Sequence, residues 1–396
     1  MAAERSRGSP PGTGGVPRAR VLRRDLGYGW VGRRRALVLS DRTDFCLPVV
    51  FGVEGADTSC ACCANAMSRA DPLSSTVLGD PVVAAPVAGA AWAERLSAVK
   101  ELSKPRITRL VTITAGMGFA LGAIGQSWSA WDLVVRAAAC LVGTALSSAG
   151  ANALNMWWER GRDARMERTA HRPLPEGRIG PGAALGVGLG FSALGVLVLL
   201  LIGPGPALVS LLTIVTYVLV YTPLKPVTRW NTLVGAVPGA LPPVIGWAAA
   251  ASGNHLTLGL EALASPAAWA LFVLMFVWQI PHFLAIAWMY REDYARGGYR
   301  MLPLEDPAGR LTFATILVWS IALVPASIAP VMLLEGRLGL VSLVAAAVSG
   351  AAFVGLCFRL YKTHERAHAR AVFLASIVHL PLLLTVMVGD ACVRAL

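Results

Sequence analysis

Long apolar segments dominate the sequence from Ile107 to its end. Each is about 18 to 25 residues long and contains few charged side chains. A helix of that length, rising ~1.5 Å per residue, crosses the ~30 Å hydrocarbon core of a bilayer. We therefore predict an all-α integral membrane protein in which nine transmembrane helices form a bundle. The predicted spans are 107–126, 132–157, 181–202, 206–223, 232–251, 266–290, 312–334, 338–358 and 371–392.

Composition excludes the soluble classes of protein. Of the 396 residues, 55% are hydrophobic and 15% are charged, against about 25% charged residues in a typical soluble domain. One soluble core cannot bury so many apolar side chains, and the composition is neither collagen-like, disulfide-rich nor that of a disordered chain. The net charge of +12 is more typical of basic loops facing an anionic leaflet than of a nucleic-acid-binding protein. We expect the bilayer, and no nucleic acid, as a partner.

Residues 1–90 differ from the rest of the chain. They are rich in Arg, Gly, Pro, Ala and Ser and show no helical or strand periodicity, so we predict a disordered segment or a mis-assigned extension. There is no cleavable signal peptide, and nine acidic residues before residue 95 argue against a mitochondrial transit peptide. The cluster of Cys60, Cys62 and Cys63 lacks a second ligand pair at zinc-site spacing. The membrane domain is predicted to comprise residues 95–396.

Basic residues are distributed unevenly between the predicted loops. Those after the second, fourth, sixth and eighth spans carry 16 basic residues, whereas the alternate loops and the C-terminus carry only Arg337 and Arg394. By the positive-inside rule, the N-terminus and the basic loops lie in the cytoplasm and the C-terminus lies outside. We expect a bacterial inner membrane, with the mitochondrial inner membrane as second choice.

The segment after the second span concentrates acidic and amide side chains. If that span continues as a helix, Asn155, Glu159 and Asp163 recur every four residues, each step drifting ~40° and rising ~6 Å. One acidic face then leaves the membrane at the cytoplasmic mouth of the bundle. Such oxygen ligands suit Mg²⁺, which is commonly shared with substrate phosphates. The alternative is a solvated helix carrying surface ion pairs.

A second charged segment follows the sixth span and favours a site over a solvated helix. It reads YREDYARGGYRMLP and includes Glu292 and Asp293, so two carboxylate-bearing helix ends meet on one side of the membrane. Basic side chains on the same side are candidates to contact a diphosphate, although simple positive-inside orientation would also explain some of them. These candidates are Arg162, Arg168, Arg172, Lys225, Arg229 and Arg291.

A histidine lies deep within the predicted sixth span. Pro281 removes a backbone donor and predicts a kink beside His282, and an ionisable group at membrane depth is a candidate functional residue. The alternative is a histidine that is hydrogen-bonded to a neighbouring helix. His379 is the other histidine placed within a span.

Three motifs together resemble one enzyme family. They are N-x-x-x-E-x-x-x-D followed by R-M-E-R-T-x-x-R-P-L, then Y-T-x-x-K with G-A-x-P-P-x-x-G-W, and finally P-H-F with E-D-Y-A-R-x-G-x-x-M-L-P. In this order they resemble the protohaem IX farnesyltransferases (haem O synthases) of the UbiA-type intramembrane prenyltransferase superfamily. The resemblance covers roughly residues 95 to 392. Glu159 stands where the family usually has Asp, and Gly161 where it often has another Asp.

The resemblance implies a central cavity within the bundle and transfer of a farnesyl group from farnesyl diphosphate to a vinyl group of haem b. It assigns Asn155, Glu159 and Asp163 to the first Mg²⁺-diphosphate motif, with Asp293 and Glu292 in the second acidic segment; which of these two ligates metal is open. Mg²⁺ is the implied cofactor. His282 and His379 become candidates to contact haem. A downstream haem A synthase or terminal oxidase becomes a candidate partner.

Three alternative functions remain at this stage. A related prenyltransferase would act on a quinone precursor or a chlorophyll-type ring, but the D-Y-A-R-x-G-x-x-M-L-P segment favours haem. A secondary transporter would use the charges as a gate, yet we find no convincing internal repeat in the sequence. An assembly scaffold for an oxidase would not need clustered carboxylates.

Overall fold

The computed structural model describes residues 88–251, 259–334 and 336–396. The predicted extension and its cysteine cluster therefore lie almost entirely outside the described residues. Within the described ranges the chain is helical and contains no strand. The elements are α1 (Ala88–Leu102), α2 (Pro105–Ala123), α3 (Ala130–Asp163), α4 (Pro181–Leu200), α5 (Pro204–Val215), a π-helical turn (Thr216–Tyr221), α6 (Thr222–Leu224), α7 (Asn231–Ala240), α8 (Pro242–Ala250), a 3₁₀ turn (Glu261–Ala264), α9 (Pro266–Met289), α10 (Arg291–Arg296), α11 (Leu302–Glu305), α12 (Arg310–Leu333), α13 (Leu340–Thr363) and α14 (Arg366–Ala395).

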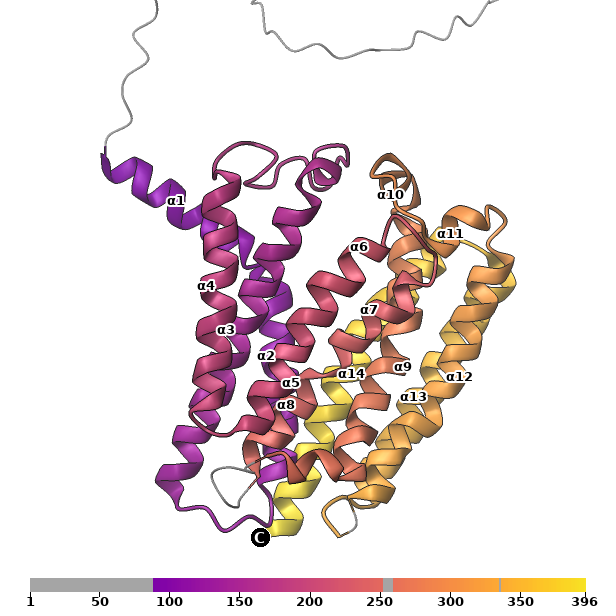
Figure 1. Ribbon diagram of the computed structural model, residues 1–396. Helices are drawn as coiled ribbons and strands as arrows, with labels where there is room; N and C mark the ends of the chain where they lie inside the picture. Colours follow the sequence, from indigo (N-terminus) through magenta and orange to yellow (C-terminus); the bar gives the residue numbers. More distant parts are fainter. Residues whose placement is uncertain (1–87, 252–258, 335) are drawn as a thin grey trace, which may run out of the picture. The chain divides into compact units, whose positions relative to one another are not determined.

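Each of the nine predicted spans corresponds to one helix or to two or three consecutive helical elements, which confirms the all-α membrane fold (Figure 1). Within the described residues, eight segments are long and apolar enough to cross a bilayer, including the composite helices Pro204–Leu224 and Asn231–Ala250. The remaining predicted span, 107–126, corresponds to α2, which has 19 residues and carries Arg106 and Arg109 in its first turns. The chain is an integral membrane protein.

Close helix packing depends on small residues. A Cβ on Gly246 of α8 would collide with the backbone carbonyl of Ala115 in α2, and one on Gly150 of α3 would collide with Ser192 of α4. In lipid, where apolar burial gives little driving force, such close backbone approach supplies the packing energy between helices. These glycines therefore set the separation of the helix pairs that support the first half of the bundle.

Two spans are interrupted. The fourth passes through the π-helical turn Thr216–Tyr221, where Thr222 Oγ1 donates to the Tyr217 carbonyl at 2.8 Å. The fifth is divided between α7 and α8 at Leu241, directly before Pro242 and Pro243. Proline cannot donate its backbone nitrogen, so it ends the hydrogen-bond ladder of α7. The π-helical turn has more residues per turn than an α-helix, so it changes the direction of the side chains that follow it.

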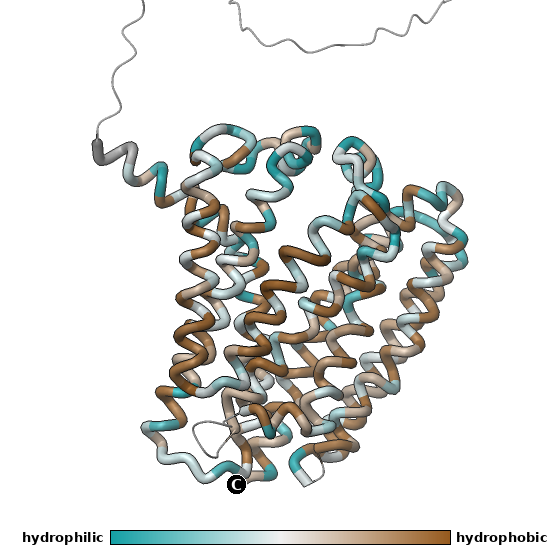
Figure 2. Tube along the Cα trace, in the orientation of Figure 1, coloured by the Kyte–Doolittle hydropathy of each residue, from teal (hydrophilic) through white to brown (hydrophobic). Residues whose placement is uncertain are grey.

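The charged connections gather at one end of the bundle. Figure 2 shows hydrophilic residues in the α3–α4 connection and around α10 and α11, and Figure 1 places the C-terminus at the opposite end. At that opposite end, arginines have structural partners: Arg136 donates to the Ile202 carbonyl at 3.0 Å, and Arg394 lies 3.2 Å from Asp390. The charged end is therefore where a polar site can form.

Candidate active site

Helix α3 carries the predicted acidic face into the protein interior. As expected, the helix continues beyond the second span to Asp163, so Asn155, Glu159 and Asp163 lie along one face. Their exposed fractions are 1%, 5% and 0%. A solvated helix would expose these side chains, so the structure favours a buried polar site over a solvated helix. Unpaired charges at such depth would be costly, and each side chain accordingly has a basic neighbour.

Three cations from three different segments pair with this face. Lys104 Nζ, just before α2, donates to Asn155 Oδ1 at 2.7 Å. Lys225 Nζ, just after α6, lies 2.8 Å from Glu159 Oε1.

The third cation comes from the α3–α4 connection, where Arg172 Nη1 donates to Asp163 Oδ2 at 2.6 Å. The same connection is anchored by Thr169, whose hydroxyl donates to the Asp163 carbonyl at 2.9 Å. We call the six residues Lys104, Asn155, Glu159, Asp163, Arg172 and Lys225 the polar cluster.

The donor set of the polar cluster suits a hard divalent cation. Asp163 Oδ1 is buried and has no hydrogen-bond partner among the described residues, so one carboxylate oxygen is available. Glu159 and the Asn155 amide oxygen lie on the same helix face. No group of three or more His, Cys, Asp or Glu side chains that could hold a metal occurs in the part of the chain that the structure describes. An ion here would need oxygens from the amide, water or a bound phosphate, as Mg²⁺ commonly takes.

Aromatic rings and a threonine complete the polar cluster. Asn155 Nδ2 donates to Thr222 Oγ1 at 2.9 Å, directly after the π-helical turn. Lys225 Nζ lies 4.6 Å from the centroid of the Tyr221 ring and 6.0 Å from that of Tyr299. Ring faces attract cations, so these tyrosines help to hold the ammonium at this position.

The two lysines differ in protonation. Burial, together with the neighbouring Arg172 charge, lowers the pKa of Lys104 to about 7. Burial also acts to lower the pKa of Lys225, but the Glu159 carboxylate outweighs it and raises that pKa well above the usual value. Lys225 is thus a permanent cation next to Glu159, whereas the charge of Lys104 depends more strongly on what else occupies the polar cluster.

The structure places Asp293 of α10 against the α3–α4 connection. Its Oδ1 accepts the Glu167 backbone N–H at 3.0 Å and its Oδ2 accepts that of Arg168 at 3.2 Å. Arg296 Nη2 donates to Oδ1 at 2.7 Å. Burial acts to raise the pKa of Asp293, but these hydrogen bonds lower it overall. In this arrangement the carboxylate holds the connection that carries Arg172.

Three further sequence candidates form none of the ion pairs of the polar cluster. Arg162 lies 6.0 Å from the Tyr299 ring centroid, and its Nε lacks a hydrogen-bond partner within the described ranges. Arg168 is exposed and stacks near Tyr290, at 5.5 Å. Glu292, next to Asp293, is exposed.

Two predicted diphosphate contacts lie elsewhere. Arg229 Nη1 donates to Glu305 Oε2 at 3.2 Å, at the edge of a separate cavity. Arg291 Nη1 donates to the Pro307 carbonyl at 3.5 Å, and its guanidinium lies over Trp288. The structure therefore does not bring these two arginines to the polar cluster.

The two membrane histidines lie between helices. His282 Nδ1 is 2.7 Å from Ser376 Oγ of α14, and its ring packs between Trp278 and Phe373. His282 is therefore paired with a neighbouring helix, as the alternative interpretation of this histidine predicts. His379 stacks on Phe353, and neither of its ring nitrogens has a hydrogen-bond partner in the described residues. Their contact with haem stays a prediction.

Sequence reasoning did not assign Lys104, Thr222 or Tyr299 to the site. One signal was available: of 35 basic residues only four are lysines, and two of these, Lys104 and Lys225, lie in the polar cluster. A compact ammonium on a flexible stem differs from guanidinium as a phosphate ligand. The rarity of lysine in this arginine-rich chain is therefore a sequence signal for Lys104 and Lys225.

The profile of the UbiA prenyltransferase family matches residues 109–380. The chain belongs to this family. It is an intramembrane prenyltransferase, which favours the enzymatic alternatives over a transporter or a scaffold. It is 42% identical over 302 residues to the protoheme IX farnesyltransferase of Solibacter usitatus, covering 73% of this chain and 97% of that protein. It is 40% identical over 294 residues to the enzyme of the same name from Opitutus terrae, covering 73% and 93%.

Solved structures share the fold at low sequence identity. A digeranylgeranylglyceryl phosphate synthase superposes with a TM-score of 0.60 at 16% identity, covering 75% of this chain and 99% of that one. A UbiA homolog from Archaeoglobus fulgidus bound to DMAPP and Mg²⁺ gives 0.52 at 15% identity, covering 74% and 99%. The helix arrangement is therefore that of the UbiA fold.

Proposed function

We propose that this enzyme transfers the farnesyl group of farnesyl diphosphate to a vinyl group of haem b, producing haem O and diphosphate. The observation that carries the proposal is the polar cluster, in which two carboxylates and an amide face three cations at the charged end of the bundle. Support for the acceptor comes from relatives about 40% identical that bear the name protoheme IX farnesyltransferase.

The chain's own residues supply binding and charge. Lys104, Lys225 and Arg172 would neutralise diphosphate oxygens as negative charge develops on the leaving group. Asn155, Glu159 and Asp163 would hold Mg²⁺, which supplies further positive charge there when bound. The Archaeoglobus fulgidus homolog, solved with DMAPP and Mg²⁺, supports this choice of ion.

The bond changes follow from the charges. The farnesyl C–O bond breaks, the electron pair leaves with diphosphate, and the vinyl carbon of haem attacks the allylic cation. Water then adds to the new cation and releases a proton, leaving a hydroxyethylfarnesyl group. Tyr221 and Tyr299 lie beside Lys225, and Tyr217 packs against Tyr221. Their ring faces would steady the cation and limit access of water.

We place the enzyme in a bacterial inner membrane with its N-terminus and charged end in the cytoplasm, supported by the sequence distribution of basic loops. A downstream haem A synthase or terminal oxidase would receive the product.

The direct test is to incubate the purified full chain with haem b, farnesyl diphosphate and Mg²⁺ and to analyse the pigments by mass spectrometry. We expect a product heavier than haem b by one farnesyl group and one hydroxyl group. Reactions without Mg²⁺ or without farnesyl diphosphate are the controls. Absence of the product in an otherwise folded, diphosphate-binding preparation would contradict the proposal.

A further inference from the structure

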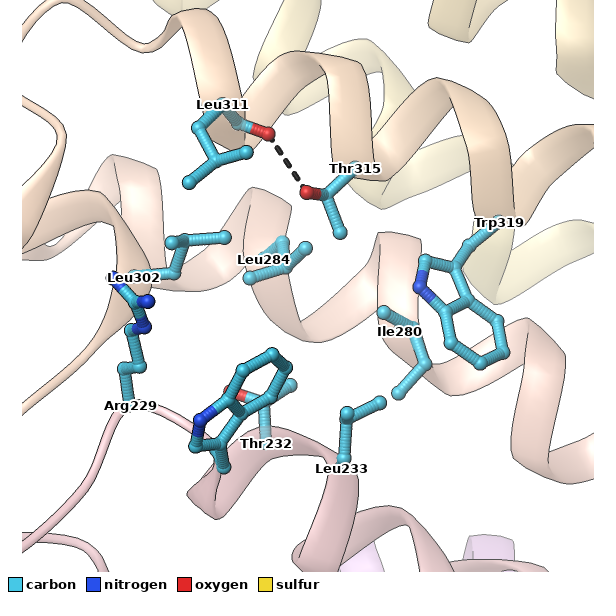
Figure 3. Close-up of a pocket in the computed structure, with 10 residues that line it drawn as sticks. Arg229, Thr232, Leu233, Ile280, Leu284, Leu302, Leu311, Thr315 and Trp319 are labelled. Atoms are coloured by element: carbon cyan, nitrogen blue, oxygen red, sulfur yellow. Dashed lines mark hydrogen bonds between the residues drawn. The ribbon is translucent and has the colours of Figure 1, made fainter.

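A cavity of about 140 Å³ lies beside the polar cluster, between α7, α9, α11 and α12. Figure 3 shows Arg229 at one edge and Trp319 at the opposite edge, with Ile280 and Leu284 of α9 between them. Apart from Arg229, Thr232 and Thr315, the lining side chains are aliphatic or tryptophan. The cavity is therefore suited to an apolar group rather than to a free polar metabolite.

The mouth of the cavity is cationic. A neighbouring polar hollow shares Arg229 and Trp230 with the cavity and adds Arg300 and Glu305. Arg229 Nη1 lies 3.2 Å from Glu305 Oε2, and Arg300 Nη2 lies 3.5 Å from Glu305 Oε1. Two guanidinium groups thus share one carboxylate, which leaves one positive charge and several N–H donors for an anion.

Backbone hydrogen bonds fix this mouth next to the polar cluster. The Arg300 N–H donates to the Lys225 carbonyl at 2.9 Å, and Asn231 Nδ2 donates to the Arg300 carbonyl at 2.6 Å. Tyr299 approaches the Lys225 ammonium, whereas the next residue, Arg300, reaches Glu305. The segment Tyr299–Arg300 therefore contributes one side chain to the surroundings of the polar cluster and the next to the mouth of the cavity.

We propose that Arg229 and Arg300 bind a propionate of the haem acceptor while one edge of the porphyrin enters the cavity. This inference rests on the proposed function. Farnesyl diphosphate has one anionic group, which the polar cluster accommodates, whereas haem b carries carboxylates on the edge opposite its vinyl groups. Of the two substrates, only haem combines an apolar body with an anion at a distance from the reacting carbon. Anchoring the propionate edge at the mouth directs the vinyl edge of the ring away from Arg229 and Arg300.

The placement is independent of the membrane histidines. Ile280 and Leu284 lie one turn apart on the face of α9 that lines the cavity, whereas His282 contacts Ser376 of α14. Recognition at the mouth therefore depends on the propionate and not on an axial ligand from His282.

The test compares haem b with its dimethyl ester, which lacks both carboxylate charges. With full-length wild-type protein, we expect the ester to bind about tenfold or more weakly in an absorbance titration, because a hydrogen-bonded charge pair is lost. Arg229→Gln and Arg300→Gln should each weaken haem b binding by a similar factor and leave binding of the ester unchanged. KM for farnesyl diphosphate should stay at the wild-type value, which also shows that the variants are folded. Arg370→Gln, an exposed arginine on α14, is the matched control.

Three results would overturn the inference. The variants could bind haem b as wild type does, they could lose affinity for haem b and the ester equally, or they could change only the dependence of activity on anionic phospholipid in nanodiscs. The last result would assign the mouth to a lipid phosphate. The titration needs no turnover, so it is distinct from the assay of haem O formation: failure of that assay with normal propionate-dependent binding would contradict the proposed reaction alone.

Discussion

The ammonium of Lys225 lies 2.8 Å from the Glu159 carboxylate and links the end of α6 to the middle of the polar face of α3. Removing both charges from water costs more than a surface pair would, and such a pair is a weak source of stability. Under the proposed function its value lies in chemistry, because it would keep a cation at the point where the diphosphate leaves.

Replacing Lys225 with Gln removes that cation. We expect kcat/KM for farnesyl diphosphate to fall by a factor on the order of a hundred to a thousand, the usual effect of losing one charge contact to a leaving group. Lys362→Gln is the matched control, since Lys362 is an exposed residue in the last turn of α13. Steady-state kinetics at equal amounts of folded protein measure both. A Lys225→Gln enzyme with wild-type kinetics would remove Lys225 from the site.

The spans and the acidic face were predictable because both depend on local pattern. Apolar length alone located helices such as α9, predicted as 266–290 and observed as Pro266–Met289. Spacing alone placed Asn155, Glu159 and Asp163 on one face, since helical periodicity persists beyond the membrane.

The partners of that face were not predictable from local pattern. Lys104 lies 51 residues before Asn155 and Thr222 lies 67 residues after it, so their contacts depend on helix packing. The π-helical turn that precedes Thr222 has no reliable sequence signature. The position of Arg229 and Lys225 at the same inner surface predicts a shared diphosphate contact, yet Lys225 pairs with Glu159 and Arg229 with Glu305.

The orientation of the bundle predicts which engineered cysteines react from outside intact cells. With the four N-terminal cysteines replaced by serine, native Cys392, which is exposed near the C-terminus, should react with an impermeant maleimide. Glu176→Cys, in the α3–α4 connection, should react only after permeabilisation. Labelling of Glu176→Cys in intact cells would reverse the orientation and move the polar cluster to the outer face.

Residues 1–87 lie outside the described structure and precede the family match, which begins at residue 109. We expect a chain that starts at Ala88, preceded by an initiator methionine, to insert and to form haem O at a rate within about twofold of the full chain, because α1 and all nine spans are retained. Membrane yield and product formation are measured together. A shortened chain that inserts normally but loses turnover would give the N-terminal segment a functional role.

The last prediction separates Asp163, which the sequence assigns to the first metal motif, from Asp293, whose role as a metal ligand the sequence leaves open. Asp163→Asn preserves shape but removes a buried carboxylate with one unpartnered oxygen. We expect turnover to fall by a factor on the order of a hundred to a thousand and the Mg²⁺ concentration for half-maximal activity to rise. The α3–α4 connection should stay ordered, because Thr169 still donates to the backbone carbonyl of residue 163.

Asp293→Asn should act through the connection instead. Its carboxylate accepts two backbone N–H groups and the Arg296 guanidinium, and an amide cannot replace all three charged hydrogen bonds. The connection should open more often, so trypsin should cleave the purified protein after Arg165 or Arg168 about tenfold faster, with the Mg²⁺ requirement unchanged. Glu176→Ala is the control, since the side chain of this exposed residue pairs with His171 and Arg178, and the substitution keeps its backbone N–H bond to the Arg172 carbonyl. Should Asp293→Asn raise the Mg²⁺ requirement without faster cleavage, Asp293 is a metal ligand and its hydrogen bonds to the connection are secondary.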